Sequence, residues 1–443
     1  MPMIPLKCPI CGANLRINSD DSAAICNHCG KPFVVKDAIV DNYVNNNRNM
    51  NENDNANRNA VMYAGVRNAV SSDDFVIEAG VLKKYHGRSR MVEIPDDVVV
   101  IGREAFKGLS VTKIVIPASV NRIDEGAFYN CSQLSFVNLP DSLTEIESNV
   151  FCGCRKLKEV KIPKTLTKIR NGAFASSGLN NIDFPSSLEW IGDYAFAHCD
   201  LLENIGFPDK TEDIGDYAFY DCTKLVNVDL SGGKRHIGSS AFEGCVSLAS
   251  VIFPRNDDCI ICNGAFAGCI SLRSIDMSNS SKIKMLTDLN EKGIFEDCKK
   301  LSDVVLPLNL DSIQYNTFAG CSELKNVVLP SNLGSINEEA FKNCLQLKEM
   351  AFPSNLGSIG EGAFRGCVGL NKISISPRTS ISRGAFYGCS INIIEGSVNN
   401  QALEYGLAGT PYAKRRKEGL CTYCGGKMNL FKTCKQCGRK KSY

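Results

Sequence analysis

The sequence predicts a repeat solenoid of about 13 coils built on a parallel β-sheet, with a small cysteine-rich domain at each end. Phenylalanines recur about every 23 residues, with one longer interval after Phe266, which is too regular for a mixed globular fold. An alternation of polar and apolar residues, closed by a proline, recurs in most of these units. Paired CxxC motifs stand outside the repeats at both ends. The phenylalanines are Phe106, Phe128, Phe151, Phe174, Phe196, Phe219, Phe242, Phe266, Phe295, Phe318, Phe341, Phe364 and Phe386.

Each unit runs approximately C-x-x-L-x-x-V-x-[IL]-P-x-x-L-x-x-I-x-x-x-A-F. In the segment KLKEVKIP, Val160 and Ile162 point to one side of the chain. Glu159 and Lys161 point to the other side, which is the period of a β-strand. Pro163 ends the strand because it has no N–H to donate to a ladder. A second short extended piece and a Gly-Ala-Phe turn then return the chain to the next strand.

One unit cannot bury its apolar side alone, so stacking must hide the Leu, Val, Ile and Phe side chains between neighbours. Each fully buried Phe or Leu contributes about 1.5–3 kcal/mol. With parallel strands about 4.8 Å apart, thirteen coils form a right-handed or horseshoe-like array roughly 60 Å long. Residues 75–94 predict a hairpin over the first coil, and residues 395–409 predict a C-terminal cap with near-helical apolar spacing. Residues 278–293, in the longest interval, predict a loop.

The stretches LPSNLGSINEEAFKNCLQL and FPSNLGSIGEGAFRGCVGL share the pattern IPxSLxxIGxxAFxGCxxL. This pattern resembles the BspA-type (Treponema-type) leucine-rich repeats, and the resemblance covers about residues 75–412. It implies a leucine-rich-repeat array. Members of that family are often surface adhesins with signal peptides or wall anchors, and neither feature is recognisable in this sequence.

A cysteine follows three residues after most of the repeat phenylalanines, and it could be a disulfide partner, a metal ligand or a packing residue. Equivalent cysteines of successive coils would lie roughly 5 Å apart and point the same way. Such a column suits neither converging disulfides nor a tetrahedral metal site. We therefore expect buried, reduced thiols that act as small apolar residues. They are Cys131, Cys154, Cys199, Cys222, Cys245, Cys269, Cys298, Cys321, Cys344, Cys367 and Cys389.

The cysteines at the chain ends have the spacing of metal ligands. Two thiolates three residues apart can bind one Zn²⁺, and a second such pair completes a tetrahedral site. Each second cysteine is followed by a glycine, which permits the turn that this geometry needs. A closed shell of four thiolates makes the zinc structural. The sequence thus predicts two zinc sites, one at Cys8, Cys11, Cys26 and Cys29, and one at Cys421, Cys424, Cys434 and Cys437.

Both cysteine sets resemble zinc ribbons, and the N-terminal one looks like the ribbon that precedes varied intracellular modules in bacterial proteins. The predicted domains are a ribbon at residues 1–40, a linker at 41–74, the solenoid at 75–412 and a basic ribbon at 413–443. Ten of the eighteen residues from Asn42 to Asn59 are Asn, a composition too polar to offset its ordering entropy by burial.

The sequence offers no set of catalytic residues, so we expect no enzyme and no small-molecule substrate. It has four histidines, without a defensible Ser/His/Asp spacing, and no glycine-rich phosphate loop. Cys259 and Cys262 form a lone CxxC, which we interpret as one packing residue and one turn residue. Cys152 is interpreted as incidental, and His28 as an exposed residue between two ligands.

The charge distribution and the hydropathy of the sequence indicate a cellular location for the protein. Residues 411–443 carry ten Lys or Arg against one acid, whereas the rest of the chain carries 40 basic and 47 acidic residues. The start, MPMIPLKCPICG, does not resemble a signal peptide, and no apolar run reaches the ~18 residues of a membrane span. We therefore expect a cytoplasmic protein that does not enter a membrane.

The leading hypothesis is a non-enzymatic scaffold that binds protein partners through the outward face of the parallel sheet. That face is mostly polar and mildly acidic, with an apolar shift at Ile252, Val305 and Val328. One alternative is a nucleic-acid- or ribosome-associated protein that acts through basic residues 411–443. Another is a surface adhesin exported without a signal peptide.

Overall fold

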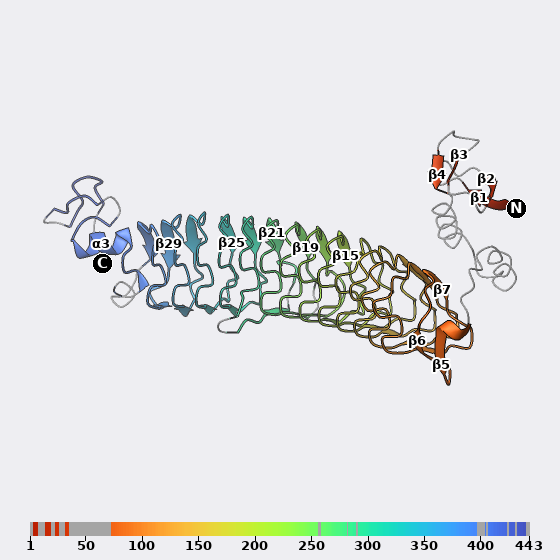
Figure 1. The fold of residues 1–443 in the computed structure, drawn as a ribbon. Helices are drawn as coiled ribbons and strands as arrows, with labels where there is room; N and C mark the ends of the chain where they lie inside the picture. Colours follow the sequence, from red (N-terminus) through yellow and green to blue (C-terminus); the bar gives the residue numbers. More distant parts are fainter. Residues whose placement is uncertain are drawn as a thin grey trace. The chain divides into compact units, whose positions relative to one another are not determined.

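The structure is a computed structural model, and the chain divides into Met1–Ser71 and Ser72–Tyr443. In the first unit it describes the backbone of four strands. In the second it describes residues 72–439, apart from 256–257, 281, 289–290, 397–403, 405, 423–424 and 430–431. The predicted linker at residues 41–74 lies almost wholly outside the described residues. Figure 1 shows the chain coloured along the sequence.

The four described strands of the N-terminal unit form two antiparallel pairs. Strand β1 (Met3–Lys7) pairs with β2 (Asn14–Asn18), and β3 (Ala23–Ile25) pairs with β4 (Pro32–Val34). Each pair encloses one of the predicted CxxC motifs in its connecting residues. The four predicted ligands Cys8, Cys11, Cys26 and Cys29 themselves lie outside the described residues.

The repeat array begins with the predicted hairpin. After a short 3-10 helix, η1 (Ser72–Asp74), strands β5 (Phe75–Glu78) and β6 (Val81–Tyr85) pair antiparallel. Strand β6 then pairs in parallel with β8 of the first coil, so the hairpin covers the end of the array. The predicted N-terminal cap is confirmed.

The strands that end near the repeat proline form one series, here called the proline-side strands (Figure 1). They make four separate parallel sheets of three strands, in the orders β7-β9-β11, β15-β17-β19, β21-β23-β25 and β27-β29-β31. Their bounds are β7 Met91–Glu93, β9 Lys113–Val115, β11 Phe136–Val137, β15 Asn204–Gly206, β17 Asn227–Asp229, β19 Ser250–Ile252, β21 Ser274–Asp276, β23 Asp303–Val305, β25 Asn326–Val328, β27 Glu349–Ala351, β29 Lys372–Ile375 and β31 Ile393–Gly396.

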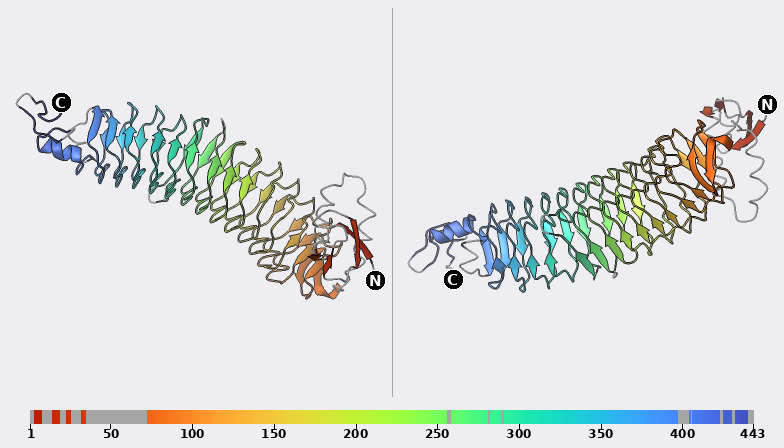
Figure 2. Two further views of the ribbon diagram at one scale, coloured as in Figure 1. Left: turned by 90° about the horizontal axis from the view of Figure 1, so that it is seen from above. Right: turned by 60° about the horizontal axis from the view of Figure 1, so that its bottom comes forward.

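The second extended piece of each unit forms a longer series, here called the phenylalanine-side strands. Within the described residues fourteen of these strands run in parallel, and seven consecutive ones, β12 to β22, make the largest sheet (Figure 2). Besides β6 they are β8 Val100–Ile101, β10 Arg122–Ile123, β12 Glu145–Ile146, β13 Lys168–Ile169, β14 Trp190–Ile191, β16 Asp213–Ile214, β18 Arg235–Ile237, β20 Cys259–Ile261, β22 Ile283–Met285, β24 Ser312–Ile313, β26 Ser335–Ile336, β28 Ser358–Ile359 and β30 Ser380–Ile381.

Two sequence predictions need correction. Val160 and Ile162 are buried and Glu159 and Lys161 are exposed, as predicted, but this segment is not a strand. Side chains can alternate between buried and exposed without the backbone hydrogen bonds that define a strand, and they do so here. Residues 278–293 are not wholly a loop, because β22 lies within them and pairs with β20. The extra residues of that coil therefore fall after β22, where the seven-stranded sheet ends and before β24 begins another sheet.

The repeat phenylalanines form a continuous stack through the middle of the array. All thirteen are buried, and neighbouring rings from Phe106 to Phe386 lie 5.1–5.6 Å apart between centroids, with interplanar angles of 3–29°. This is the range of offset-stacked aromatic pairs. Tyr85 of the cap extends the stack at its N-terminal end, 5.3 Å from Phe106. The long coil does not break it, since Phe266 and Phe295 remain 5.5 Å apart.

The repeated cysteines are buried free thiols, as predicted, but they are more than apolar filler. In all eleven coils that carry one, the thiol lies 3.0–3.3 Å from the carbonyl oxygen of the repeat phenylalanine one coil earlier. A carbonyl oxygen has two lone pairs and cannot donate, so the thiol is the donor. The oxygen of Phe219, for example, accepts from Cys222 N in its own turn and from Cys245 Sγ of the next.

Burial also keeps these thiols protonated. It raises the pKa of the Cys131 and Cys199 thiols to about 12, far from neutral pH. A protonated thiol retains the hydrogen that the phenylalanine carbonyl needs. The column is therefore held in the neutral, protonated form by the interior that it helps to build.

The C-terminal end contains one described α-helix, α3 (Pro411–Lys417), which spans the predicted boundary at residue 412. Thr410 caps its N-terminus by accepting from Ala413 N, and Pro411 occupies the first helical position. The predicted cap at residues 395–409 lies largely outside the described residues, although Leu407 is buried. No helix among the described residues is long and apolar enough to cross a bilayer.

The thiol–carbonyl bonds give a stability prediction. Cys245→Ala should lower the free energy of unfolding by about 1–2 kcal/mol, because a buried hydrogen bond and sulfur contacts are lost. The half-buried Cys152 does not belong to the column, so Cys152→Ala should change it by less than about 0.5 kcal/mol. Urea unfolding under reducing conditions, followed by circular dichroism, measures both. Equal losses for the two variants would contradict a special role for the column.

Candidate metal centre and binding surfaces

Three of the predicted C-terminal ligands come together in the structure. The sulfur atoms of Cys421, Cys434 and Cys437 all lie within 4.8 Å of one another, and those of Cys421 and Cys437 are 3.7 Å apart. This is the only group of three or more Cys, His, Asp or Glu with that geometry in the described part of the chain. The fourth predicted ligand, Cys424, lies outside the described residues.

The two cysteine motifs fold in the same way. In the first, Gly425 N donates to Cys421 O and Cys421 N donates to Gly426 O. In the second, Gly438 N donates to Cys434 O and Cys434 N donates to Arg439 O. Gly425 and Gly438 have φ values of 77° and 72°, so each turn needs the left-handed conformation that the sequence predicted for glycine. With this repeated turn, the sulfur atoms of Cys421, Cys434 and Cys437 converge.

The sulfur geometry fits a tetrahedral metal. Zinc–sulfur bonds of about 2.3 Å give a sulfur–sulfur separation of about 3.8 Å in a tetrahedral site, close to the 3.7 Å of the Cys421–Cys437 pair. A disulfide needs about 2.05 Å and is excluded at this separation. The N–H groups of Gln436 and Cys437 point at Cys434 Sγ, at 3.3 and 3.5 Å. Such donors favour the thiolate form that binds a metal.

Arg415 attaches the first C-terminal cysteine motif to the last coil. Arg415 of α3 donates to Thr422 O at 3.0 Å and to Asn392 Oδ1 at 2.5 Å. Tyr412 N also donates to Ile391 O at 2.9 Å. Arg415 thus ties the first cysteine turn to the end of the array, and it is not a freely presented positive charge.

The outward face of the proline-side strands is exposed and polar, as predicted. Asn227 donates to Asn204 Oδ1 at 2.8 Å, and Asn326 donates to Asp303 Oδ1 at 2.6 Å, so polar side chains pair across adjacent coils. The predicted apolar shift is confirmed at Ile252 and Val328, which are 48% and 56% exposed. Strands β19 and β21 belong to separate sheets, and a recess of about 270 Å³ lies between them, lined by Ile252, Arg255 and Asp276 among others.

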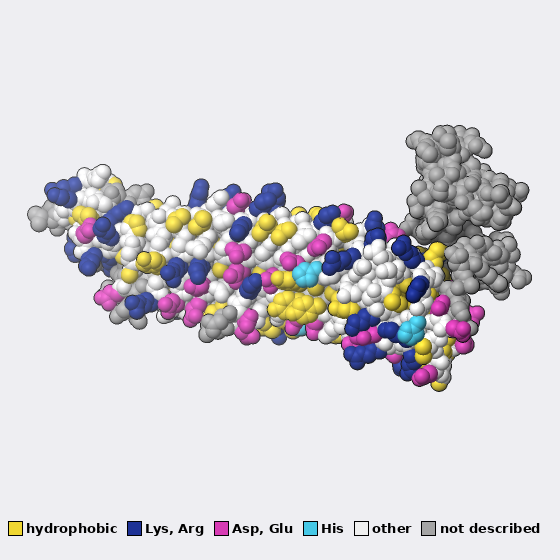
Figure 3. All heavy atoms as spheres, viewed as in Figure 1, with side chains coloured by type: hydrophobic (Ala, Val, Ile, Leu, Met, Phe, Trp, Pro, Cys, Tyr) yellow, Lys and Arg dark blue, Asp and Glu magenta, His cyan; other side chains and the backbone are white. Residues whose placement is uncertain are grey.

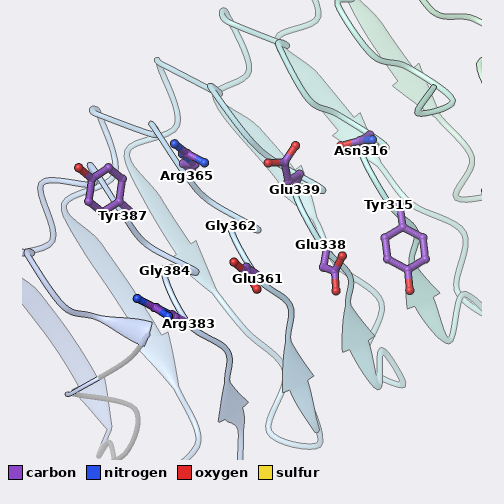
Figure 4. A pocket seen from close by; sticks show the side chains of 10 residues that line it. All are labelled: Tyr315, Asn316, Glu338, Glu339, Glu361, Gly362, Arg365, Arg383, Gly384 and Tyr387. Atoms are coloured by element: carbon purple, nitrogen blue, oxygen red, sulfur yellow. The ribbon is translucent and has the colours of Figure 1, made fainter. Parts of the chain in front are cut away.

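A larger groove of about 540 Å³ lies along the turns that precede the repeat phenylalanines, over four successive coils (Figure 4). Its glutamates come from the coils of Phe341 and Phe364, and its arginines come from the coils of Phe364 and Phe386. Arg365 lies over the ring of Tyr387 at 5.7 Å. The groove is open and mixed in charge, and no pattern in the sequence predicted it. Its lining residues are Tyr315, Asn316, Glu338, Glu339, Glu361, Gly362, Arg365, Arg383, Gly384 and Tyr387.

A cluster of aromatic side chains stands out at the middle of the array. The rings of Tyr194 and Tyr217 stack at 4.8 Å with an interplanar angle of 5°. Tyr220 meets Tyr217 edge-on at 5.7 Å, and the ring of His198 meets Tyr220 at 5.4 Å. Tyr194 is 48% exposed. We call Tyr194, Tyr217, Tyr220 and His198 the aromatic patch.

Two members of the patch have an unfavourable backbone conformation. Tyr194 and Tyr217 both have φ of 55°, in the left-handed region, which costs a non-glycine residue roughly 1–2 kcal/mol. Glycine or asparagine takes the same position, two residues before the repeat phenylalanine, in coils such as those of Gly172, Gly264 and Asn316. Stacking with its neighbour is a partial compensation for each ring. Glu104, Ser240 and Glu339 hold the same left-handed position in their coils, so the conformation belongs to the repeat, and the stacking of their rings is what distinguishes Tyr194 and Tyr217.

The patch lies among carboxylates. Burial, the neighbouring Tyr217 and the charges of Asp193 and Asp216 raise the pKa of Tyr194, and Asp221 does the same for the pKa of Tyr220. His198 lies 3.8 Å from Asp221. On the face seen in Figure 3, acidic, basic and apolar side chains are interspersed along the array. The patch therefore combines neutral rings with local negative charge, a combination suited to a positively charged ligand.

Comparison with known proteins identifies the repeats. The family model described as "BspA type Leucine rich repeat region (6 copies)" matches residues 85–202, 189–287 and 290–406. These matches cover well over half of the chain. The chain belongs to the BspA-type leucine-rich repeat family. The resemblance of the IPxSLxxIGxxAFxGCxxL pattern to these repeats is thereby confirmed. No curated protein matches the chain.

A solved structure supports the leucine-rich-repeat fold. A leucine-rich repeat protein from Bacteroides ovatus is 30% identical, with a TM-score of 0.55, and the match covers 71% of this chain and 92% of that one. Two further structures are less similar. A leucine rich cell surface protein from Faecalibacterium prausnitzii is 22% identical over 75% and 95% of the two chains, with a TM-score of 0.45. A leucine-rich repeat protein from T. pallidum is 28% identical over 46% and 89%, with a TM-score of 0.34.

The aromatic patch predicts an unusual mutational result. Replacing both Tyr194 and Tyr217 by Asn should change the free energy of unfolding by less than about 1 kcal/mol, because relief of backbone strain offsets the lost stacking. Phe196→Ala, in the buried stack of the same coils, should cost about 3–5 kcal/mol. Urea unfolding of the three proteins makes the comparison. A double variant as unstable as Phe196→Ala would mean that the tyrosines hold the array together.

Proposed function

We propose that this chain is a non-enzymatic, cytoplasmic scaffold that binds protein partners through its repeat array. The BspA-type repeats support a binding role, because stacked coils offer an extended surface and no enclosed substrate site. The observation that carries the proposal is the aromatic patch, where the ring of Tyr194, which is 48% exposed, stacks on the ring of Tyr217 one coil later. The cytoplasmic location and the absence of enzyme activity remain predictions from the sequence.

The patch defines the chemistry of the partner. Tyrosines are enriched at the energetically dominant centres of protein interfaces, where their rings give contact area at low entropic cost. The carboxylates of Asp193, Asp216 and Asp221 add negative charge around the rings. We propose that a Lys- or Arg-rich protein segment binds here, with its cations over the rings of Tyr194 and Tyr217. The polar face of the proline-side strands extends the contact surface.

Affinity capture with the full chain tests this function. The wild-type protein should retain protein partners from a lysate of its source cells, and partners should dissociate as salt is raised. Replacing Tyr194 and Tyr217 by Asn should lower the affinity for a partner at least tenfold, which is about 1.4 kcal/mol of binding energy. Tyr387→Ser, which removes a 58% exposed ring elsewhere on the array, is the matched control. Unchanged capture by the double variant would reject the patch, and turnover of a metabolite without any protein partner would reject the scaffold.

We further propose that two structural zinc ions support the ends of the chain, each bound by four cysteines. The converging sulfur atoms of Cys421, Cys434 and Cys437 support the C-terminal site, with Cys424 as its fourth ligand. The paired strands β1–β2 and β3–β4 support the N-terminal site, since each CxxC motif joins the strands of one pair. With four thiolates per ion, zinc would be held without an open position and would stabilise the local turns.

Metal analysis separates the two sites. The purified full chain should contain about two zinc ions, measured by inductively coupled plasma mass spectrometry, as expected for two four-cysteine sites. Cys434→Ser should remove the C-terminal ion alone, Cys11→Ser the N-terminal ion alone, and Cys152→Ser neither. Zinc that persists in full after both ligand substitutions, or its absence from the wild-type protein, would contradict the assignment.

A second candidate is association with nucleic acid through residues 411–443. The last turn of α3 carries Lys414, Arg415, Arg416 and Lys417, which favours contact with phosphates. Arg415 is engaged by Thr422 and Asn392, which leaves a shorter basic segment for binding. Replacing Lys414 and Lys417 by Glu would abolish salt-dependent RNA or DNA binding under this alternative, and would leave protein capture unchanged under the scaffold proposal.

A further inference from the structure

Four side chains from successive coils form a connected polar chain on the phenylalanine-side strands. Cys262 Sγ lies 3.5 Å from His236 Nε2, and His236 Nδ1 lies 2.9 Å from Asp213 Oδ1. Trp190 donates from its indole N–H to the other oxygen of Asp213 at 3.1 Å. His236 is exposed and Cys262 is half-buried, so the thiol end of this chain is accessible from solvent.

The parallel register of the coils brings these residues together. Trp190 pairs with Asp213, and Asp213 pairs with His236, so the three occupy one outward column. Cys262 follows Ile261, which pairs with Ile237, so the cysteine lies beside Gly238. From that position the Cys262 thiol reaches diagonally to His236 Nε2. Other coils carry glycine at the position of Cys262, as at Gly192 and Gly215.

The hydrogen bonds define the role of the imidazole. A carboxylate can only accept, so Asp213 places the proton of neutral His236 on Nδ1 and leaves the lone pair of Nε2 facing the Cys262 thiol. A nucleophile next to a base that a third group orients is the arrangement of an activated thiol. We propose that Cys262 is a reactive thiol that exchanges with positively charged disulfides, with His236 as its base and Asp213 as a positioning residue.

A metal site is the other use of a Cys–His pair. It would need further ligands around the same point, and among the described residues only the cysteines at 421, 434 and 437 form a group of three. The lone CxxC motif does not supply one either. Cys259 is fully buried and Cys262 is on the outward side of the chain, so the two sulfur atoms face opposite ways. Because the two sulfur atoms face opposite ways, Cys259 cannot attack a mixed disulfide formed at Cys262.

The charges around Cys262 favour a positively charged disulfide as the electrophile. Burial and the negative charges of Asp216, Asp213 and Asp288 raise the pKa of the Cys262 thiol. A preformed thiolate is therefore disfavoured, and proton removal by His236 has to accompany attack. The same carboxylates attract a cationic disulfide and repel an anionic one, and salt screens both effects.

The exchange step is balanced without another reactant. The proton of the Cys262 thiol moves to His236 Nε2 as the sulfur attacks one sulfur of the disulfide R–S–S–R. A new S–S bond forms to Cys262 and the S–S bond of the reagent breaks. The departing R–S⁻ takes the proton from His236 and leaves as R–SH. Cys262 is oxidised to a mixed disulfide, and one half of the reagent is reduced to a thiol.

Timed labelling of the full chain tests the proposal. The protein is treated with cationic cystamine, neutral hydroxyethyl disulfide or anionic glutathione disulfide, quenched by alkylation and mapped by peptide mass spectrometry. Cys262 should react with cystamine at least about tenfold faster than Cys152, a half-buried free thiol for which the described residues offer no histidine partner. Cys262 should react fastest with cystamine, more slowly with hydroxyethyl disulfide and most slowly with glutathione disulfide. Added salt should reduce the differences between the three rates.

Variants separate a reactive thiol from a structural contact. His236→Gln should slow labelling of Cys262 about tenfold or more for all three reagents and leave Cys152 unchanged. Asp213→Asn should slow it as well and also weaken the preference for cystamine, which loss of packing alone would not do. Equal urea midpoints would show that the exposed substitutions preserve the fold. Labelling of Cys262 no faster than Cys152, or unaffected by His236→Gln, would overturn the proposal.

Discussion

Each coil of the array must form its backbone hydrogen bonds with the neighbouring coils, because a unit of about 23 residues is too thin to satisfy these groups within itself. The repeat phenylalanine is where this constraint is tightest. Its ring stacks on the next ring in the core, so its own carbonyl is turned inward and buried. A thiol from the following coil meets that carbonyl in eleven coils. The thiol adds a polar contact to the ring stacking and to the backbone hydrogen bonds between coils, and the ring spacing does not depend on it, since Phe151 and Phe174 lie 5.3 Å apart where Ser177 replaces the cysteine.

Spacing in the sequence was enough to predict the coil number closely, the buried phenylalanine column and the N-terminal hairpin. Those features depend on periodicity and on burial, which apolar residues report directly. The phenylalanine-side strands were harder to assign, since most are only two residues long, with one buried isoleucine. The role of the thiols was also hidden, because a cysteine in a core has the same pattern whether it fills space or donates a hydrogen bond. Arg235 is a further case: its guanidinium is buried and donates to the carbonyls of Phe207 and Pro208, which its polar neighbours in sequence do not suggest.

The cysteine motifs at the chain ends illustrate where spacing is sufficient for a site. Residues three apart in a tight turn are close in any fold, so Cys421, Cys434 and Cys437 could be grouped before the structure was known, and the structure brings their sulfur atoms together. The aromatic patch could not be found in that way. Tyr194 and Tyr217 stand one full coil apart in the sequence, and their left-handed backbone becomes evident only when the glycines of equivalent turns are compared with them. A pair of stacked aromatic rings at the surface is a local departure from the repeat, and such departures are where a repeat protein can carry specific recognition.

The same reasoning explains why Cys259 and Cys262 do not act as a pair, although they form a CxxC motif. In a strand, residues three apart face opposite sides of the sheet, so proximity in sequence separates the two thiols. In a solenoid the relevant neighbour lies one coil away. Asp213 and His236 are separated by one coil and occupy equal positions, whereas Cys262 lies slightly more than one coil beyond His236 and diagonally across from it. Adding the coil length to the position of each polar residue is therefore a better search for sites in this fold than scanning for short motifs. It places a base, His236, beside a thiol, Cys262, on an otherwise regular surface.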